Sequence, residues 1–205
     1  MKLTAELTQK FSIHDLLKRF KLSTDCINFI TENVETLTLG KGEYFSVHGK
    51  YCKRIGLLFK GLLYACYYPQ DRTDEVVSRF FYETKNIIVT SFESFTEEKL
   101  SEESIIAIED SYLLCISSEK LFELYDRYPE INYVVRELAQ QSYIQAMQRV
   151  HNLQTMSSKE KVRDFLSKNP GLFNRVKRQQ VASYLGINRN DLTKYANLFM
   201  KQNLP

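Results

Sequence analysis

Residues 178–195 read RQQVASYLGINRNDLTKY, and this stretch decides the fold of the end of the chain. The small side chain of Ala182 allows a second helix to cross closely over the first. Gly186 can adopt the left-handed conformation that ends a helix, and Asn188 can then cap the next one. The spacing therefore predicts a helix-turn-helix whose second helix spans residues 188–199.

The two predicted helices bury a shared apolar face formed by Val181, Leu185, Ile187, Leu192 and Tyr195. A row of hydrogen-bond donors is left on the outer face of the second helix, as reading of the DNA major groove requires. The predicted base contacts are Arg189, Asn190, Thr193 and Lys194. The predicted contacts to the DNA backbone are Arg175, Lys177, Arg178, Gln179 and Asn197.

The charge of the chain supports this interpretation, because it is divided unevenly. Residues 157–205 carry ten Lys and Arg against three Asp and Glu, a net charge of +7. The whole chain is +3, so residues 1–156 have a net charge of −4. A basic module joined to a mildly acidic one favours a nucleic-acid-binding domain attached to a second domain.

Upstream of the basic region, the hydrophobic pattern predicts a set of short strands. Apolar runs recur about every ten residues, separated by turn signals such as Lys60-Gly61. The expected strands are 37–39, 44–47, 55–59, 62–68, 76–81, 86–89, 105–108 and 112–116. This pattern is typical of an antiparallel barrel or roll. Helical spacing is expected before it, over residues 1–33, and after it from Ser118.

A long helix is predicted from Pro129, since proline is tolerated at a first helical turn, to about Leu153. Its apolar stripe fits either a spine between two domains or one half of a dimer seam. The seam is the preferred interpretation, because one small domain offers little surface to cover so long a helix. The expected interface residues are Ile131, Val134, Val135 and Leu138, and Leu138→Glu is expected to give monomers.

Together these elements resemble a known architecture. Residues 42–49, GEYFSVHG, and residues 54–67, RIGLLFKGLLYACY, look like the β-roll of cyclic-nucleotide-binding domains. With the long helix and the helix-turn-helix, nearly the whole chain resembles the Crp/Fnr superfamily of bacterial transcription regulators.

The resemblance implies an α+β fold in three parts: a jelly-roll-like sensor β-roll (a double-stranded β-helix) over residues 1–128, a dimerisation helix over 129–156 and a helix-turn-helix domain over 157–205. It also implies a cytoplasmic homodimer that binds a two-fold-related site on double-stranded DNA and acts with RNA polymerase. Six residues follow position 199, so the β-hairpin wing common in the superfamily is expected to be reduced or absent.

Ligand binding does not carry over from the resemblance. Nucleotide-binding members hold the cyclic phosphate with a Gly-Glu pair and an arginine, and the arginine position falls near Ser101. The segment 91–104 has neither feature, and it contains five glutamates against one lysine. An anionic phosphate in a partly desolvated pocket needs a cation or several N–H donors. We therefore expect no cyclic nucleotide in the usual mode; the effector is unknown, and no cofactor is expected.

The sequence also argues against an enzyme and against a membrane protein. The three histidines are scattered and none of the four cysteines forms a C-x-x-C pair, so no metal site is expected and the cysteines are expected to be buried apolar side chains. No apolar run approaches the roughly 18 residues of a membrane span, and residues 1–6 lack a signal-peptide pattern. Two alternatives stay open: a regulatory interaction module that no longer binds DNA and, less favoured, a cupin-type metalloenzyme.

Overall fold

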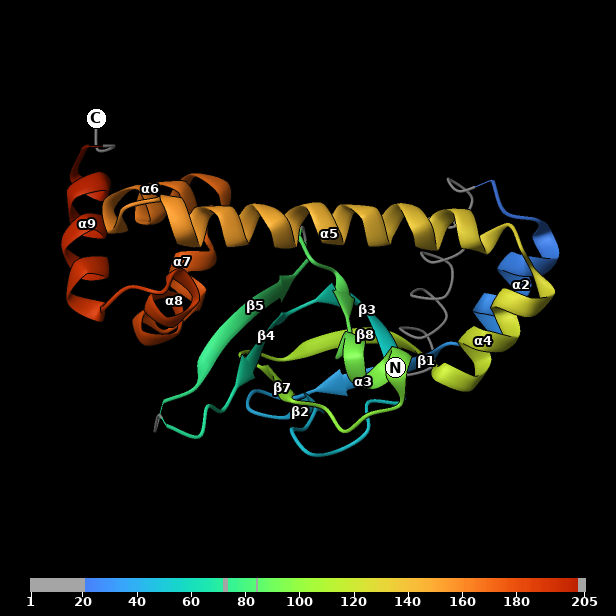
Figure 1. The fold of residues 1–205 in the computed structure, drawn as a ribbon. Helices are drawn as coiled ribbons and strands as arrows, with labels where there is room; N and C mark the ends of the chain where they lie inside the picture. Colours follow the sequence, from blue (N-terminus) through green and yellow to red (C-terminus); the bar gives the residue numbers. More distant parts are fainter. Residues whose placement is uncertain (1–20, 72–73, 84, 203–205) are drawn as a thin grey trace.

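The computed structural model describes residues 21–71, 74–83 and 85–202 (Figure 1). The helical spacing expected over residues 1–20 lies outside the described residues. The strands are β1 (Glu35–Leu39), β2 (Tyr44–Ser46), β3 (Arg54–Lys60), β4 (Leu62–Tyr67), β5 (Val76–Tyr82), β6 (Ile88–Val89), β7 (Glu103–Ala107) and β8 (Ser111–Ser117). The helices are α2 (Thr24–Asn33), α3 (Phe92–Glu97), α4 (Ser118–Arg127), α5 (Ile131–Thr155), α6 (Ser158–Lys168), α7 (Leu172–Arg175), α8 (Arg178–Leu185) and α9 (Arg189–Gln202).

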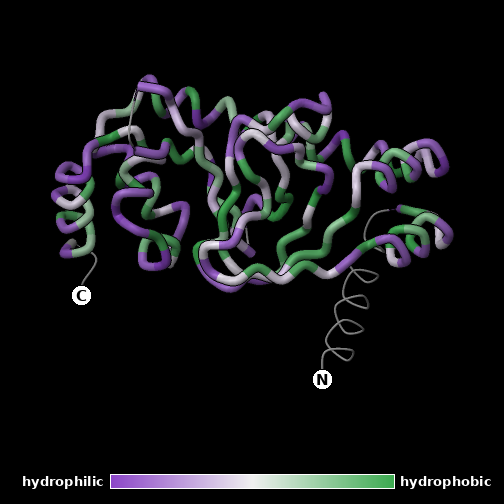
Figure 2. Tube along the Cα trace, turned by 90° about the horizontal axis from the view of Figure 1, so that it is seen from below, coloured by the Kyte–Doolittle hydropathy of each residue, from purple (hydrophilic) through white to green (hydrophobic). Residues whose placement is uncertain are grey.

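The strands form two four-stranded antiparallel sheets, with the orders β1-β8-β3-β6 and β2-β7-β4-β5. Alternate residues point between the sheets, where Phe45, Leu58, Leu63, Phe81 and Ile105 belong to one apolar core. The strands at the centre of the molecule carry much of the hydrophobic trace in Figure 2. The expected β-roll and the α+β fold class are therefore confirmed.

Strand β4 is buried on both of its faces, which explains why its sequence LLYACY is apolar throughout. Leu63 and Ala65 point into the roll. Leu62, Tyr64 and Cys66 point the other way and pack with residues of α6–α9, hereafter the helical domain. Within that domain α8 lies beside β5 (Figure 1). The helical domain thus covers the outer face of the sheet β2-β7-β4-β5.

A separate apolar cluster joins α2, α4 and the first half of α5. Phe29 and Ile30 of α2 and Leu121 and Leu124 of α4 lie in this cluster. It also takes in the four α5 residues expected in a dimer interface, Ile131, Val134, Val135 and Leu138. Ile131 and Val134 are buried in the cluster, and Val135 and Leu138 are partly buried against it. These side chains therefore have apolar neighbours within the chain, and their place in a dimer interface stays a prediction.

All strands of the described residues lie between Glu35 and Ser117. The described residues end with α9 at Gln202, so the expectation of a reduced or absent wing stays a prediction. None of the described helices is long and apolar enough to cross a membrane. The four cysteines are buried as expected, and burial raises the pKa of the Cys115 thiol to about 12.

Gly61, between β3 and β4, occupies a place where a side chain does not fit. Its φ is +115°, and a Cβ atom there would lie 2.5 Å from the Cα atom of Ser111. Gly61→Ala should therefore lower the free energy of unfolding by about 3 kcal/mol in urea denaturation.

Gly49→Ala is the matched control. Gly49 also has a positive φ, +76°, but no atom lies within 4 Å of its Cβ position. Only the backbone cost of about 1 kcal/mol is expected there. Equal losses in the two variants would contradict the close approach of Ser111 to Gly61.

Candidate nucleic-acid interface

The helix-turn-helix forms where the sequence predicts it. Helix α8 ends at Gly186, whose φ of +61° lies in the left-handed region and whose amide donates to the Ser183 carbonyl at 3.1 Å. The Oδ1 atom of Asn188 accepts the N–H of Asp191 at 2.8 Å and so caps α9. Helix α9 extends to Gln202, three residues beyond the predicted end.

The two helices bury the predicted apolar face. Val181 and Leu192 are fully buried and Leu185 is nearly so. Ile187 and Tyr195 are partly buried and pack against the same cluster. This packing fixes which side of α9 faces solvent.

All four predicted base-contact residues are exposed on α9. Arg189 and Asn190 lie at its N-terminal end, and Thr193 and Lys194 follow one turn later on the same face. The hydroxyl of Thr193 donates to the Arg189 carbonyl at 2.9 Å. Within the described residues, neither Arg189 nor Lys194 forms an ion pair. Both cations therefore face solvent in the N-terminal half of α9.

The residues predicted to contact the DNA backbone fall into two groups. Lys177, Gln179 and Asn197 are exposed. Arg178 is half-buried, with its guanidinium carbon 3.4 Å from the centre of the Phe173 ring, and burial lowers its pKa. Lys177 and Gln179 are thus exposed at the start of α8, with Arg178 partly exposed between them, and Asn197 is exposed on α9.

Arg175 is engaged within the chain, and its predicted phosphate contact stays a prediction. Its guanidinium forms ion pairs with Glu83 and Glu109 of the roll. The sequence shows Arg175 only as one charge in a basic segment, because both partners are far away along the chain.

The position expected for a phosphate-binding arginine, near Ser101, is closed by hydrogen bonds. The Ser101 hydroxyl donates to Ser91 Oγ at 2.8 Å, and both serines are buried. Beside them the carboxylate of Glu103, only 5% exposed, forms an ion pair with Arg79. Burial raises the pKa of Glu103, and Arg79 opposes that shift. The interior of the roll therefore holds its own anion at this position.

Two arginines with structural roles were not identified from the sequence. Arg79 points into the roll from β5. It lies two residues before the inward-facing Phe81, and residues two apart in a strand share a face, so strand alternation could have indicated its inward direction. Arg149 of α5 lies over the Tyr184 ring, with its guanidinium carbon 4.3 Å from the ring centre. No local pattern distinguishes Arg149 from the other charges of a long helix.

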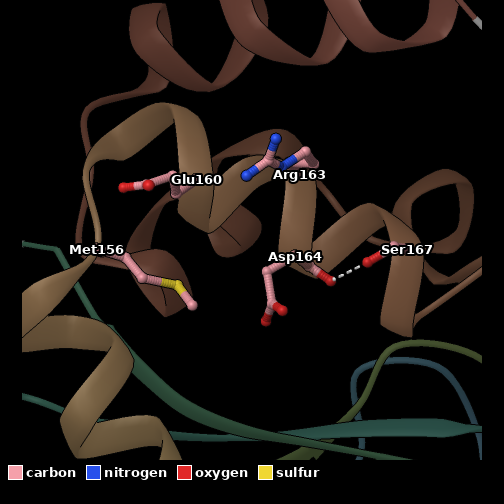
Figure 3. Close-up of a pocket in the computed structure, with 5 residues that line it drawn as sticks. All are labelled: Met156, Glu160, Arg163, Asp164 and Ser167. Carbon is pink, nitrogen blue, oxygen red and sulfur yellow. Dashed lines mark hydrogen bonds between the residues drawn. The ribbon is translucent and has the colours of Figure 1, made fainter.

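A hollow of about 320 Å³ lies at α6 and the end of α5, lined by Met156, Glu160, Arg163, Asp164 and Ser167 (Figure 3). Its two carboxylates already have structural partners. Glu160 accepts the N–H of Ser157 at 2.9 Å in a capping box, and Asp164 pairs with Lys168 at 2.7 Å. In the part of the chain that the structure describes, no three His, Cys, Asp or Glu side chains gather as metal ligands.

No family model and no curated protein matches this sequence. Solved structures do match its fold. FixK2 from Bradyrhizobium japonicum is 11% identical with a TM-score of 0.71, and the match covers 82% of this chain and 85% of FixK2. A protein from Eubacterium rectale described as a Crp/Fnr-family transcriptional regulator is 18% identical with a TM-score of 0.69, over 92% of this chain and 88% of that one. The c-di-GMP-responsive global regulator CLP from Xanthomonas campestris is 16% identical with a TM-score of 0.68, over 89% and 94%. The chain therefore has the fold of Crp/Fnr regulators, and the resemblance seen in the sequence is confirmed at the level of fold.

Removal of Arg79 should reveal the cost of burying Glu103. Arg79→Met leaves that carboxylate without its cation, and the free energy of unfolding should fall by about 3 kcal/mol at pH 7. The pKa of Glu103 is raised in the folded chain above its ordinary value of 4.5, so proton uptake favours the folded state. The loss should therefore shrink as the pH falls from 7 to 5, measured by urea denaturation at both values.

The control is the double variant Arg79→Met with Glu103→Leu. It removes both charges, so it should recover most of the lost stability at pH 7. A loss in Arg79→Met that is the same at both pH values would show that the buried carboxylate is not its cause.

Proposed function

We propose that this chain is a sequence-specific DNA-binding transcription regulator of Crp/Fnr type that acts as a homodimer on a two-fold-related site. The observation that carries the proposal is the exposed row of donors on α9, oriented by the buried face of the helix-turn-helix. The net charge of +7 over residues 157–205 adds the general attraction to phosphates that such binding needs.

The side chains on α9 suit particular bases. Arg189 can donate two hydrogen bonds to O6 and N7 of guanine, and Asn190 can pair with N6 and N7 of adenine. Lys177 and Gln179, at the exposed start of α8, are placed for phosphates, which fix position without reading sequence.

Arg189→Ala tests the assignment of α9. Against an operator selected in vitro with the wild-type chain, the variant should lose about 1–3 kcal/mol of binding free energy and discriminate poorly at one base pair. Fluorescence anisotropy on the operator and its single-base variants measures both effects. Unchanged affinity would mean that α9 does not read the groove.

Lys177→Ala is the comparison for this test. It removes one phosphate contact, so binding should weaken by a similar factor on every sequence and the salt dependence should become shallower. If no DNA is enriched by the wild-type chain, the alternative of an interaction module without DNA binding gains support.

The second half of α5 supports the homodimer. Tyr143, Ile144, Met147 and Val150 follow helical spacing and are 67%, 64%, 48% and 44% exposed. Such a contiguous apolar stripe on a soluble chain marks an interface. A second copy is the partner we propose, because two copies related by a two-fold axis match a two-fold DNA site. We propose this stripe as the interface in preference to Ile131, Val134, Val135 and Leu138, which have apolar neighbours within the chain.

Ile144→Glu should give monomers, because it places an unpaired charge in the proposed seam. Light scattering should then report the 24.1 kDa chain mass in place of twice that value. Leu138→Glu is the control: Leu138 is partly buried against the apolar cluster of α2, α4 and α5, so the variant should lose about 2 kcal/mol of stability and remain a dimer. A monomeric Leu138→Glu beside a dimeric Ile144→Glu would return the interface to the first half of α5.

The effector of this regulator is not assigned, and a cyclic nucleotide is disfavoured. The buried Glu103 carboxylate lies two residues from Ser101, near which the resemblance puts the phosphate-binding arginine of nucleotide-binding members. Like charges in a desolvated interior repel strongly.

A further inference from the structure

The contact between the helical domain and the roll has the character of a protein core. Leu62, Cys66 and Val77 of the roll are fully buried in it, together with Val162 and Val181 of the helical domain. Around the apolar centre, polar groups pair across the contact, as at the rim of a permanent interface. The Tyr82 hydroxyl, for example, donates to Asn169 Oδ1 at 2.8 Å.

Arg175, the last residue of α7, joins three turns at one end of the roll. Its Nη1 and Nη2 atoms donate to both carboxylate oxygens of Glu83, each at 3.1 Å. Its Nε and Nη2 atoms bind the two oxygens of Glu109, and Nη2 also lies 3.3 Å from the Gly61 carbonyl. Glu83 follows β5, Glu109 lies between β7 and β8, and Gly61 lies between β3 and β4. Two bidentate pairs on one guanidinium define a single orientation.

Glu83 is itself held in place for this contact. Its Oε1 atom accepts the Gly61 N–H at 2.9 Å. Although burial opposes it, the hydrogen bonds from Arg175 and from the backbone hold the pKa of Glu83 below its usual value. The hydrogen bonds to Glu109 and Glu83 also raise the pKa of Arg175. The cluster is therefore charged at neutral pH.

Arg149 makes a second contact at the other end of β5. Its Nη1 donates to the Tyr184 carbonyl at 2.9 Å and its Nη2 lies 3.4 Å from the Val77 carbonyl. Beside it, the Val77 N–H donates to Ser183 Oγ at 2.9 Å. Because β5 has seven residues, the two arginine contacts lie about 20 Å apart along the strand. Two fixed points at that separation oppose rotation of the helical domain on the roll.

We propose that Arg175 and Arg149 are positioning residues that fix the orientation of the helix-turn-helix on its own roll, and thereby set the spacing between the two DNA half-sites that a dimer can bind. The proposal rests on the proposed function, in which two copies of α9 must enter grooves about one helical turn apart. Neither arginine needs to touch DNA for this role.

The first test measures spacing selectivity. The wild-type chain, Arg175→Ala and Arg175→Lys are titrated against a selected operator and against operators with one base pair added or removed between the half-sites. Arg175→Ala should lose about tenfold of the wild-type preference for the selected spacing. Arg175→Lys, which keeps the charge but not the two-pronged contact, should fall between them. Arg149→Met should resemble Arg175→Ala.

Lys177→Ala is the matched control, because it removes the same charge two residues away at an exposed position. It should weaken binding to all spacings alike and leave the preference at the wild-type value. If Arg175→Ala keeps the wild-type spacing preference, the positioning role is overturned.

The second test needs no DNA and so separates this proposal from the proposed function. Exchange of the Val77 amide, which donates to Ser183 across the contact, reports docking of the helical domain. In Arg175→Ala this amide should exchange at least about tenfold faster, while the amide of Ile105 in the roll core keeps its rate. Unchanged exchange at Val77 overturns the positioning role of Arg175, even if the chain binds no DNA. Faster exchange at Val77 supports that role, whatever the chain binds.

Discussion

The burial of β4 on both faces is the constraint on which the other parts of this structure depend. One face of the strand completes the core of the roll, and the other forms a core with the helical domain. Separation of the two domains would expose Leu62 and Cys66 to water, at about 1–3 kcal/mol for each apolar side chain of that size. The helix-turn-helix is therefore packed against the roll through a shared apolar core. The polar contacts around that core join two surfaces that are already held together.

Helix α5 connects this body to the proposed partner. Its first half is covered by α2 and α4, and its second half exposes Tyr143, Ile144, Met147 and Val150. Arg149 lies within the exposed half, yet it turns toward β5 and α8. The proposed dimer contact and the contact that orients α8 thus share two turns of one helix.

The interior of the roll carries the Arg79–Glu103 charge pair close to Ser101. Burial of Glu103 is unfavourable by itself, and the ion pair with Arg79 offsets that cost. The serines beside it satisfy one another. The buried carboxylate at this position is thus neutralised by a cation of the same chain.

The sequence by itself determined the elements that depend on near neighbours. The turn at Gly186, the cap at Asn188 and the alternation of the strands are set by residues a few positions apart, so their patterns are visible before folding. The buried face of the helix-turn-helix followed from the same periodicity, and it placed Arg189 and Lys194 outward.

The tertiary structure alone decided what the remaining charges and apolar stripes contact. Glu83 and Glu109 are 92 and 66 residues from Arg175, and Leu138 packs against the apolar cluster of α2, α4 and α5 only when the chain has folded. Such contacts depend on which distant elements meet, and a linear pattern of charge or hydrophobicity carries no record of that choice.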